Sequence, residues 1–399
     1  MTLASGRTHL AIPGPSVFPE AVLRAMHRTA PNIYEGELPD MVPGIVEDLK
    51  AIARTRHHVA VYIANGHGAW EAAVSNVFSR GDKVLVMATG SFGLGWASVA
   101  SGLGLDVEIM DFGKRSPVDP DRLADRLAQD KGGQIKAVLS VQVDTATGVR
   151  NDVPAMRAAL DKAGHPALLM IDCIACLACD AFEMDEWGVD VMVAASQKGL
   201  MTPPGLGFVF FNDRADAARD GADCATPYWD WRPRSRPEIF YQYFGGTAPT
   251  NHLYGLRVAL DMIRDEGLIS VWQRHAALAQ AVWSAVDHWG QDGPLEINAP
   301  SANIRSNAVT AVRAGSAKGT ELRQWCETRA GLTLGIGLGL ADPDTPEWHH
   351  NFRIGHMGHV NATMVLGTLA TIEAGLKAVG IAHQPGGAEA AAQVIAAQA

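Results

Sequence analysis

The chain has 399 residues, of which 47% are hydrophobic and 19% are charged, and this balance excludes an intrinsically disordered protein. Its formal net charge of −10 offers no basic face for a nucleic acid. The N-terminus lacks the apolar segment of a signal peptide, and no uninterrupted apolar run reaches the length of about 18 residues that a membrane span needs. The length suits a large α/β enzyme of two closely joined domains, which we expect in the cytoplasm.

Short apolar runs alternate with segments of helical periodicity after a proline-rich N-terminal arm (residues 1–20). Runs that are apolar at every position are typical of strands buried on both faces of a mostly parallel sheet. The pattern therefore predicts an α/β fold, with functional residues in loops at the carboxyl ends of the strands. The predicted strands cover residues 59–63, 83–87, 106–110, 135–142, 167–172, 189–195 and 207–212.

The pattern changes near Asn251, where two long amphipathic segments predict consecutive helices. Short strands, a further helix and a final pair of helices follow, which indicates a smaller α+β domain. We expect a large domain over residues 21–266 and a small one over 267–399. The later elements are predicted at residues 251–265, 268–289, 306–312 and 318–327.

Three of the five cysteines, Cys173, Cys176 and Cys179, form a CxxCxxC run. Such a run could hold an iron–sulfur cluster if a fourth thiolate lay close by, but none follows closely. The surrounding segment is nearly all apolar, which favours thiols packed as small hydrophobic groups after a strand. We therefore expect no metal site here.

Two candidate catalytic side chains lie near the ends of predicted strands. Lys198 follows the strand 189–195 within the sequence SQKG, and the sequence PPG lies behind it. If it is not an ordinary surface lysine, its apolar flanks would lower the pKa of the amine and allow it to form a Schiff base. Asp172 closes the strand 167–172, where it could cap the next turn or pair with a protonated ring nitrogen. The spacing alone does not choose.

A candidate phosphate site lies in the sequence NGHGAWE (residues 65–71), between a predicted strand and a helix. Backbone N–H groups at a helix start bind anions, and Gly66 and Gly68 would let a phosphate approach. The two glycines also begin a dinucleotide fingerprint, which keeps a nicotinamide dehydrogenase open. However, Glu71 replaces the third glycine and would repel a pyrophosphate, so a monophosphate is favoured.

Several motifs occur together in one order along the chain: PGP near the start, NGHGAWEAA, DTATGV, the strand-end Asp172, SQK with PPG behind it, and FRIGHMG. In this order the chain resembles the class V, fold-type I enzymes of the alanine–glyoxylate and serine–glyoxylate aminotransferase group. The resemblance covers roughly residues 10–380. It implies pyridoxal 5′-phosphate (PLP) as cofactor, a seven-stranded, mostly parallel sheet between helices, a smaller C-terminal α+β domain, and a homodimer with shared active sites.

The resemblance also implies roles for individual residues. Lys198 would bind the cofactor covalently, and Asp172 would hold the pyridinium proton. Phe244 stands where the family usually has a tyrosine, which leaves one phosphate hydrogen bond open. The other implied cofactor contacts are Gly66 and His67 at the phosphate, Gln197 beside them, Phe92 on the ring unless it is a core residue, Thr145 near the ring unless it is a turn hydroxyl, and Thr247 on the phosphate of the neighbouring subunit.

Substrate recognition is assigned to two further segments. Arg353, within FRIGH, matches the family arginine for the substrate α-carboxylate, which a planar guanidinium binds bidentately. Tyr34 and Glu35 lie in a segment expected to line the pocket, unless they lie on the surface. Their sequence differs from that of serine–glyoxylate enzymes, so the donor stays open. Four histidines nearby fit no standard metal spacing and are expected to be exposed or to lie behind the binding residues: His349, His350, His356 and His359.

The expected reaction moves the amino group of a small amino acid, such as serine or alanine, to glyoxylate or pyruvate by a ping-pong mechanism. Lys198 would then move the Cα proton as base and acid. A cysteine desulfurase is one alternative, but that class usually has histidine at the position of Gln197 and needs a reactive loop cysteine, whereas Cys326 lies in a helical pattern. A nicotinamide dehydrogenase and a non-catalytic PLP-binding regulator are the others.

Overall fold

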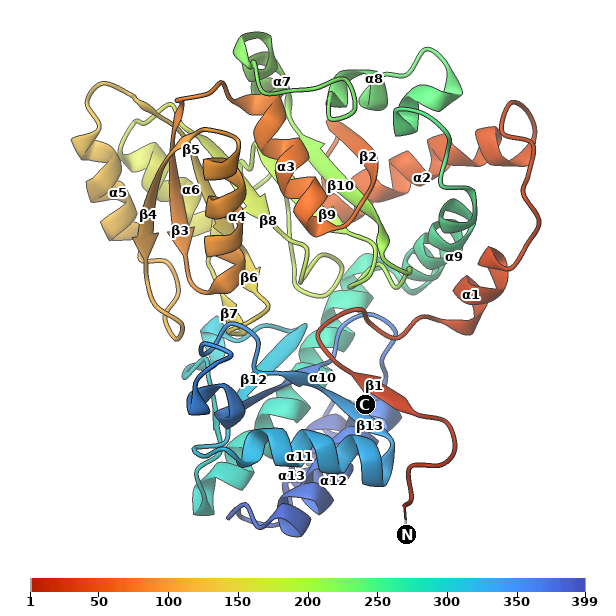
Figure 1. Cartoon of the computed structure of the whole chain (residues 1–399), viewed down its shortest axis with the longest axis vertical. Coiled ribbons are helices and arrows are strands. Elements are labelled where there is room, and N and C mark those ends of the chain that lie inside the picture. The colour runs from red at the N-terminus through yellow and green to blue at the C-terminus, as the bar shows by residue number, and fades with distance from the viewer. Residues whose placement is uncertain (1, 399) are drawn as a thin grey trace.

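The seven predicted apolar runs form one sheet in the computed structural model, which describes residues 2–398 (Figure 1). The strand order is β2-β10-β9-β8-β5-β3-β4, and β10 is antiparallel to its neighbours β2 and β9 while the other pairs are parallel. Each strand begins and ends within two residues of its predicted run. The strands are β2 (His58–Ala64), β3 (Lys83–Ala88), β4 (Asp106–Asp111), β5 (Ile135–Val141), β8 (Leu168–Asp172), β9 (Val191–Ala195) and β10 (Gly205–Phe211).

Helices cover both faces of this sheet, which explains why its strands are apolar at successive positions. In β2, Val59 and Val61 join the core under α2, α5, α6 and α9, whereas Ala60 and Tyr62 join the core under α3 and α4. The helices of this part are α1 (Glu20–Met26), α2 (Glu37–Ala53), α3 (Gly66–Val77), α4 (Ser91–Gly102), α5 (Pro120–Gln129), α6 (Val153–Lys162), α7 (Asp213–Ala218), α8 (Trp231–Ser235) and α9 (Thr250–Glu266).

A second, five-stranded sheet of order β1-β13-β14-β12-β11 forms the smaller unit, below the first in Figure 1. Four helices pack on its core. This matches the expected smaller α+β domain. The elements are β1 (His9–Ala11), α10 (Leu268–Trp289), β11 (Glu296–Ile297), β12 (Val309–Arg313), α11 (Lys318–Trp325), β13 (Leu332–Ile336), β14 (Asn351–Gly355), α12 (Ala362–Val379) and α13 (Gly387–Ala396).

The N-terminal segment is part of this small sheet. β1 pairs in parallel with β13, and Ala11 is buried in the same core, so the expected arm contains an edge strand. The expected boundaries at residues 20 and 266 stay predictions, although α9 ends at Glu266 and α10 begins two residues later. Residues 1 and 399, the ends of the expected arm and small domain, lie outside the described residues.

Helix α12 is long and apolar enough to cross a membrane by length and composition, with 18 residues and a mean hydropathy of 1.3. Its residues Leu369, Ile372 and Leu376 are buried in the core of the small domain. The helix contacts α10, α11 and α13 there. Packing within the chain therefore accounts for its apolar face.

The cysteine run is buried as predicted. Cys173, Cys176 and Cys179 follow β8 and are inaccessible, and the thiols of the first two donate to Gln142 Oε1 at 3.5 and 3.1 Å. Between residues 2 and 398, no three His, Cys, Asp or Glu side chains are grouped to hold a metal ion.

The histidines near the C-terminus differ from one another. His359 is exposed, as expected, but His356 is fully buried in the small domain. His356 Nδ1 donates to the Asn307 carbonyl and Nε2 accepts from the Thr310 hydroxyl, each at 2.9 Å. Burial lowers the pKa of His356 to about 3, so it is a neutral core residue.

Candidate active site

Lys198 lies in the turn between β9 and β10. Ser196 closes this turn, because its hydroxyl donates to the Pro203 carbonyl and accepts from the Leu206 N–H. The Lys198 amine donates to the carbonyl of Pro13 in the N-terminal segment. Burial and, to a smaller extent, the charge of Arg353 together lower the pKa of Lys198 to about 8. The amine is therefore partly unprotonated near neutral pH and nucleophilic.

The N-terminal segment forms one wall of this site. The Ser16 N–H donates to the Gln197 carbonyl and its hydroxyl donates to the Lys198 carbonyl, both at 2.8 Å. Gly14 has φ of +98°, and a Cβ there would collide with the Lys198 side chain. The glycine of the PGP motif is therefore required both by its backbone conformation and by the close approach of the lysine.

Asp172 ends β8, the central strand of the sheet, and is 4% exposed. Its Oδ2 accepts from Trp70 Nε1 at 2.9 Å and its Oδ1 accepts from the Ile174 N–H at 2.6 Å. Burial raises the pKa of Asp172 to about 7, against the effect of these two hydrogen bonds. In the described part of the chain it has no salt-bridge partner, so a cationic ring nitrogen would supply the missing charge.

The predicted phosphate site lies at the start of α3. The Asn65 side chain caps this helix, and its Oδ1 accepts from the N–H groups of His67 at 3.1 Å and Gly68 at 3.3 Å. The backbone N–H of His67, which is predicted to bind phosphate, thus already donates to Asn65. The Gly66 N–H makes no hydrogen bond within residues 2–398. A Cβ at Gly66 would meet the end of the Ile174 side chain at 2.5 Å, so a larger residue at this position would require Ile174 to move.

Gln197 carries an unpaired acceptor. Its side-chain Oε1 is buried and has no hydrogen-bond partner among the described residues. A buried polar atom without a partner costs free energy unless a ligand or water satisfies it. The predicted contact of Gln197 with a cofactor would remove this cost.

Phe92 and Thr145 are held by Asp144, a residue that sequence reasoning did not single out. Asp144 is buried at the end of β6 (Val143–Asp144), which pairs with β7 (Val149–Arg150), and its carboxylate accepts from the N–H groups of Phe92 at 2.8 Å, Gly93 at 3.2 Å and Ala146 at 3.0 Å. Phe92 is the second residue of α4 and only partly buried. One carboxylate thus fixes both the start of α4 and the loop of Thr145.

Arg353 connects the two domains. It lies in β14 and is 6% exposed; its Nε donates to the Ile336 carbonyl at 2.7 Å and its Nη1 to the Thr145 carbonyl at 2.8 Å. Burial lowers the pKa of Arg353 to about 10. No carboxylate pairs with it within residues 2–398, and Nη2 has no partner there. The site thus holds a buried cation that lacks an anion.

The single chain does not bring every predicted residue to Lys198. Tyr34 is 86% exposed and lies with Glu35 in the loop between α1 and α2. This loop runs along the edge of the molecule in Figure 1. The hydrogen bonds of both residues are to Asn32 in the same loop. Thr247 is also exposed. Their predicted roles therefore stay predictions that depend on a second subunit.

Phe244 has a structural explanation. It ends a short 3₁₀ helix (Phe240–Phe244), is buried, and packs against Phe240 and Tyr243 with ring centroids 5.7 and 6.1 Å apart. Its ring is a core element that contributes no phosphate hydrogen bond.

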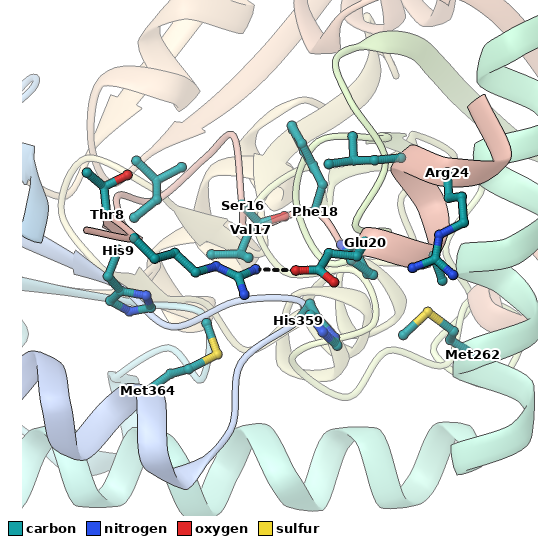
Figure 2. A pocket seen from close by; sticks show the side chains of 15 residues that line it. Thr8, His9, Ser16, Val17, Phe18, Glu20, Arg24, Met262, His359 and Met364 are labelled. Atoms are coloured by element: carbon teal, nitrogen blue, oxygen red, sulfur yellow. Dashed lines mark hydrogen bonds and ion pairs between the residues drawn. The ribbon is translucent and has the colours of Figure 1, made fainter. Parts of the chain in front are cut away.

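A separate groove of about 880 Å³ lies between the N-terminal segment, α9 and the start of α12 (Figure 2). Arg7 and Glu20 form an ion pair in it, but both side chains are exposed, so the pair contributes little to stability. Ser16 is common to the groove and the site, because it lines the groove and its hydroxyl donates to the Lys198 carbonyl. Lys198, Asp172 and Arg353 do not line it.

The sequence profile of the family described as Aminotransferase class-V matches residues 34–345. The chain belongs to this family. It is 37% identical to the serine–glyoxylate aminotransferase of Methylorubrum extorquens, over 98% of this chain and 96% of that protein. It is 35% identical to the L-aspartate–glyoxylate aminotransferase of Paracoccus denitrificans, over 96% and 94% of the two chains.

A solved structure agrees over the whole fold. The pyridoxamine–pyruvate aminotransferase from Mesorhizobium loti superposes with a TM-score of 0.88 at 26% identity and covers 99% of this chain and 98% of its own. The predicted family, fold type and enzyme class are confirmed, and this chain is a PLP-dependent aminotransferase.

The residues present suit PLP. A partly neutral lysine, a buried carboxylate without a cation and, among the described residues, an unpaired glutamine oxygen lie at or just after the carboxyl ends of β8 and β9, which are neighbours in the sheet. When bound, PLP supplies an electron-withdrawing ring that stabilises negative charge at the substrate Cα. Cys326 offers no nucleophile of the desulfurase kind, because it is buried and burial raises its pKa to about 12.

Proposed function

We propose that this aminotransferase moves the amino group of a small amino acid, such as serine or alanine, to glyoxylate or pyruvate. The observation that carries the proposal is Arg353, whose buried guanidinium has an unpartnered Nη2 and no carboxylate within residues 2–398. Amino acids and 2-oxo acids share the carboxylate that would complete it. The names of the relatives, which use glyoxylate or pyruvate, support the choice of acceptor.

Proton transfer at Cα is assigned to Lys198. Its amine lies in a turn that Ser196 and Ser16 hold by hydrogen bonds, which restricts where the amine can lie. A pKa lowered to about 8 suits a group that must both take and return a proton near neutral pH. The second half of the reaction uses the same residues in reverse order.

The choice of donor is assigned to the loop of Tyr34 and Glu35 of a partner subunit. Arg353 cannot distinguish donors, because all of them carry the same carboxylate. The loop is exposed in the single chain and free to reach a neighbour. A glutamate in the pocket would repel a dicarboxylic donor, so changes at Tyr34 or Glu35 should alter the order of donors.

Arg353→Ala tests the proposal. The variant leaves the substrate carboxylate without its partner, at a cost of about 2 to 5 kcal/mol, so kcat/KM should fall roughly 30-fold to several thousandfold for every donor. The assay pairs single amino acids with glyoxylate, pyruvate or 2-oxoglutarate. Arg313→Ala is the matched control, since Arg313 lies on neighbouring β12 and pairs with Glu296 at the surface. Loss of one donor with another spared would disprove the assignment, and no turnover with any pair would disprove the reaction.

We also propose a homodimer with shared active sites, in which Thr247 reaches the cofactor phosphate of the partner. Its exposed position in the single chain supports this. Lys198→Ala and Thr247→Ala subunits, when mixed, should form hybrids with one intact site and regain activity. If each active site were instead built from a single subunit, every site in such a hybrid would carry one of the two substitutions, and none would be intact. Mixed samples that stay as inactive as each parent, or an active monomer, would contradict the proposal.

A cytoplasmic location is proposed as well. The five cysteines are free and buried, which supports a reducing compartment. The acidic net charge of −10 supports small-molecule substrates rather than nucleic-acid partners.

A further inference from the structure

Trp70 is the residue of the NGHGAWE motif that the proposed function leaves unused. It is the fifth residue of α3, is buried, and donates from Nε1 to Asp172 Oδ2 at 2.9 Å across 102 residues of sequence. We propose that Trp70 is a positioning residue, which fixes the Asp172 carboxylate so that its remaining lone pairs meet the cofactor ring nitrogen. The inference rests on the PLP cofactor and not on the identity of the donor.

Packing prevents the indole from turning away. Its ring is stacked on that of Trp96, with ring centroids 6.3 Å apart and an interplanar angle of 15°. The centroid of the His67 ring lies 4.6 Å from that of Trp70. A Cβ at Gly95 would lie 3.2 Å from the Trp70 ring, tighter than an ordinary contact. The absence of a side chain at Gly95 thus makes room for the indole, and the N–H has a fixed direction.

The hydrogen bonds of Asp172 require such a fixed donor. Ile174 N–H holds Oδ1 and Trp70 holds Oδ2, so both oxygens are oriented by neutral donors. A donor to a carboxylate oxygen favours the ionised form, and burial acts in the opposite direction. Without the indole N–H, Asp172 would keep its own proton up to a higher pH, and the protonated carboxyl has no charge to pair with a protonated ring.

The neighbouring tryptophan provides a matched control. Trp96 stacks on Trp70 and is also fully buried, but its Nε1 has no hydrogen-bond partner in the described chain. Trp70→Phe and Trp96→Phe therefore remove the same atoms from one aromatic pair. Only the first removes a hydrogen bond to Asp172.

The first readout is the affinity of the apoenzyme for PLP and for pyridoxamine 5′-phosphate, measured by equilibrium titration between pH 5 and 9. A hydrogen bond to a charged group contributes enough for Trp70→Phe to weaken cofactor binding about tenfold. The pH at which affinity falls on acidification should also move upward, since Asp172 becomes easier to protonate. Trp96→Phe keeps an aromatic ring beside the indole and keeps the hydrogen bond from Trp70 to Asp172, so it should change both quantities much less.

Two further variants keep the test decisive. The tryptophan isostere 3-benzothienylalanine at position 70 replaces only the indole N–H by sulfur and keeps the packing. It should reproduce the upward pH shift even if Trp70→Phe fails to fold. In an Asp172→Asn background, the Trp70 N–H no longer faces a carboxylate, so Trp70→Phe should cause no further loss of affinity. The proposal would be overturned if the isostere left the pH at which affinity falls unchanged, or if Trp96→Phe had an effect equal to that of Trp70→Phe. It would also be overturned if Trp70→Phe had its full effect in the Asp172→Asn background.

Discussion

Replacing Lys198 by alanine will abolish transamination and the covalent link to PLP that borohydride reduction makes permanent. The amine is the one nucleophile of the site that the turn after β9 holds against the N-terminal segment. Mass spectrometry of the reduced protein measures the label. The surface substitution Lys131→Ala, in an exposed turn, should retain both label and activity. Persistent labelling of the Lys198→Ala protein would show that another lysine holds the cofactor.

The pH dependence of cofactor attachment follows from the same amine. With a pKa of about 8, roughly a tenth of the amine is unprotonated at pH 7, against fewer than about one in a thousand at the ordinary value of 10.5. The attachment rate of the apoenzyme should therefore rise as pH rises through about 8 and level off above about 9. Because the charge of Arg353 helps to lower this pKa, Arg353→Ala should move the rise to higher pH. A rate still climbing at pH 10 would contradict the buried position of Lys198.

The fold was largely predictable because burial on both faces leaves an unambiguous pattern. Strands such as β9 are apolar at every position, and their limits follow from composition alone to within two residues. The antiparallel direction of β10 and the three-residue strand β1 were not predictable. β1 is too short to show a period, and its place depends on pairing with β13, far away in the sequence.

The residues of the site also differ in how far the sequence predicts them. Lys198, Asp172 and Arg353 were predictable because each lies in a short motif whose residue types indicate its chemical role. Asp144 and Trp70 were not singled out, since their roles appear only when chain folding brings them to Phe92 and Asp172. Both belong to sequence motifs, DTATGV and NGHGAWE, but the role of a buried donor or acceptor depends on its partner, which the sequence does not show.

Asp172→Asn should separate cofactor binding from catalysis. The substitution keeps the shape of the side chain, so its oxygen can still accept from the Ile174 N–H and preserve the turn after β8. Lys198 can still bind PLP, and the protein should remain coloured. What is lost is the charge that holds the ring nitrogen protonated, and without it the ring withdraws electrons weakly from the substrate Cα.

The rate of the half-reaction with a single amino acid should therefore fall in Asp172→Asn by the cost of breaking a buried charge pair. This cost is about 3 to 5 kcal/mol, or roughly a hundredfold to a few thousandfold in rate. Asp180→Asn is the matched control, because Asp180 is equally buried but binds Ser306 and the Asn307 N–H. It should change the free energy of unfolding and spare the half-reaction. Near wild-type rates in Asp172→Asn would mean that the carboxylate only caps the turn at Ile174, and that the ring is not protonated through this residue.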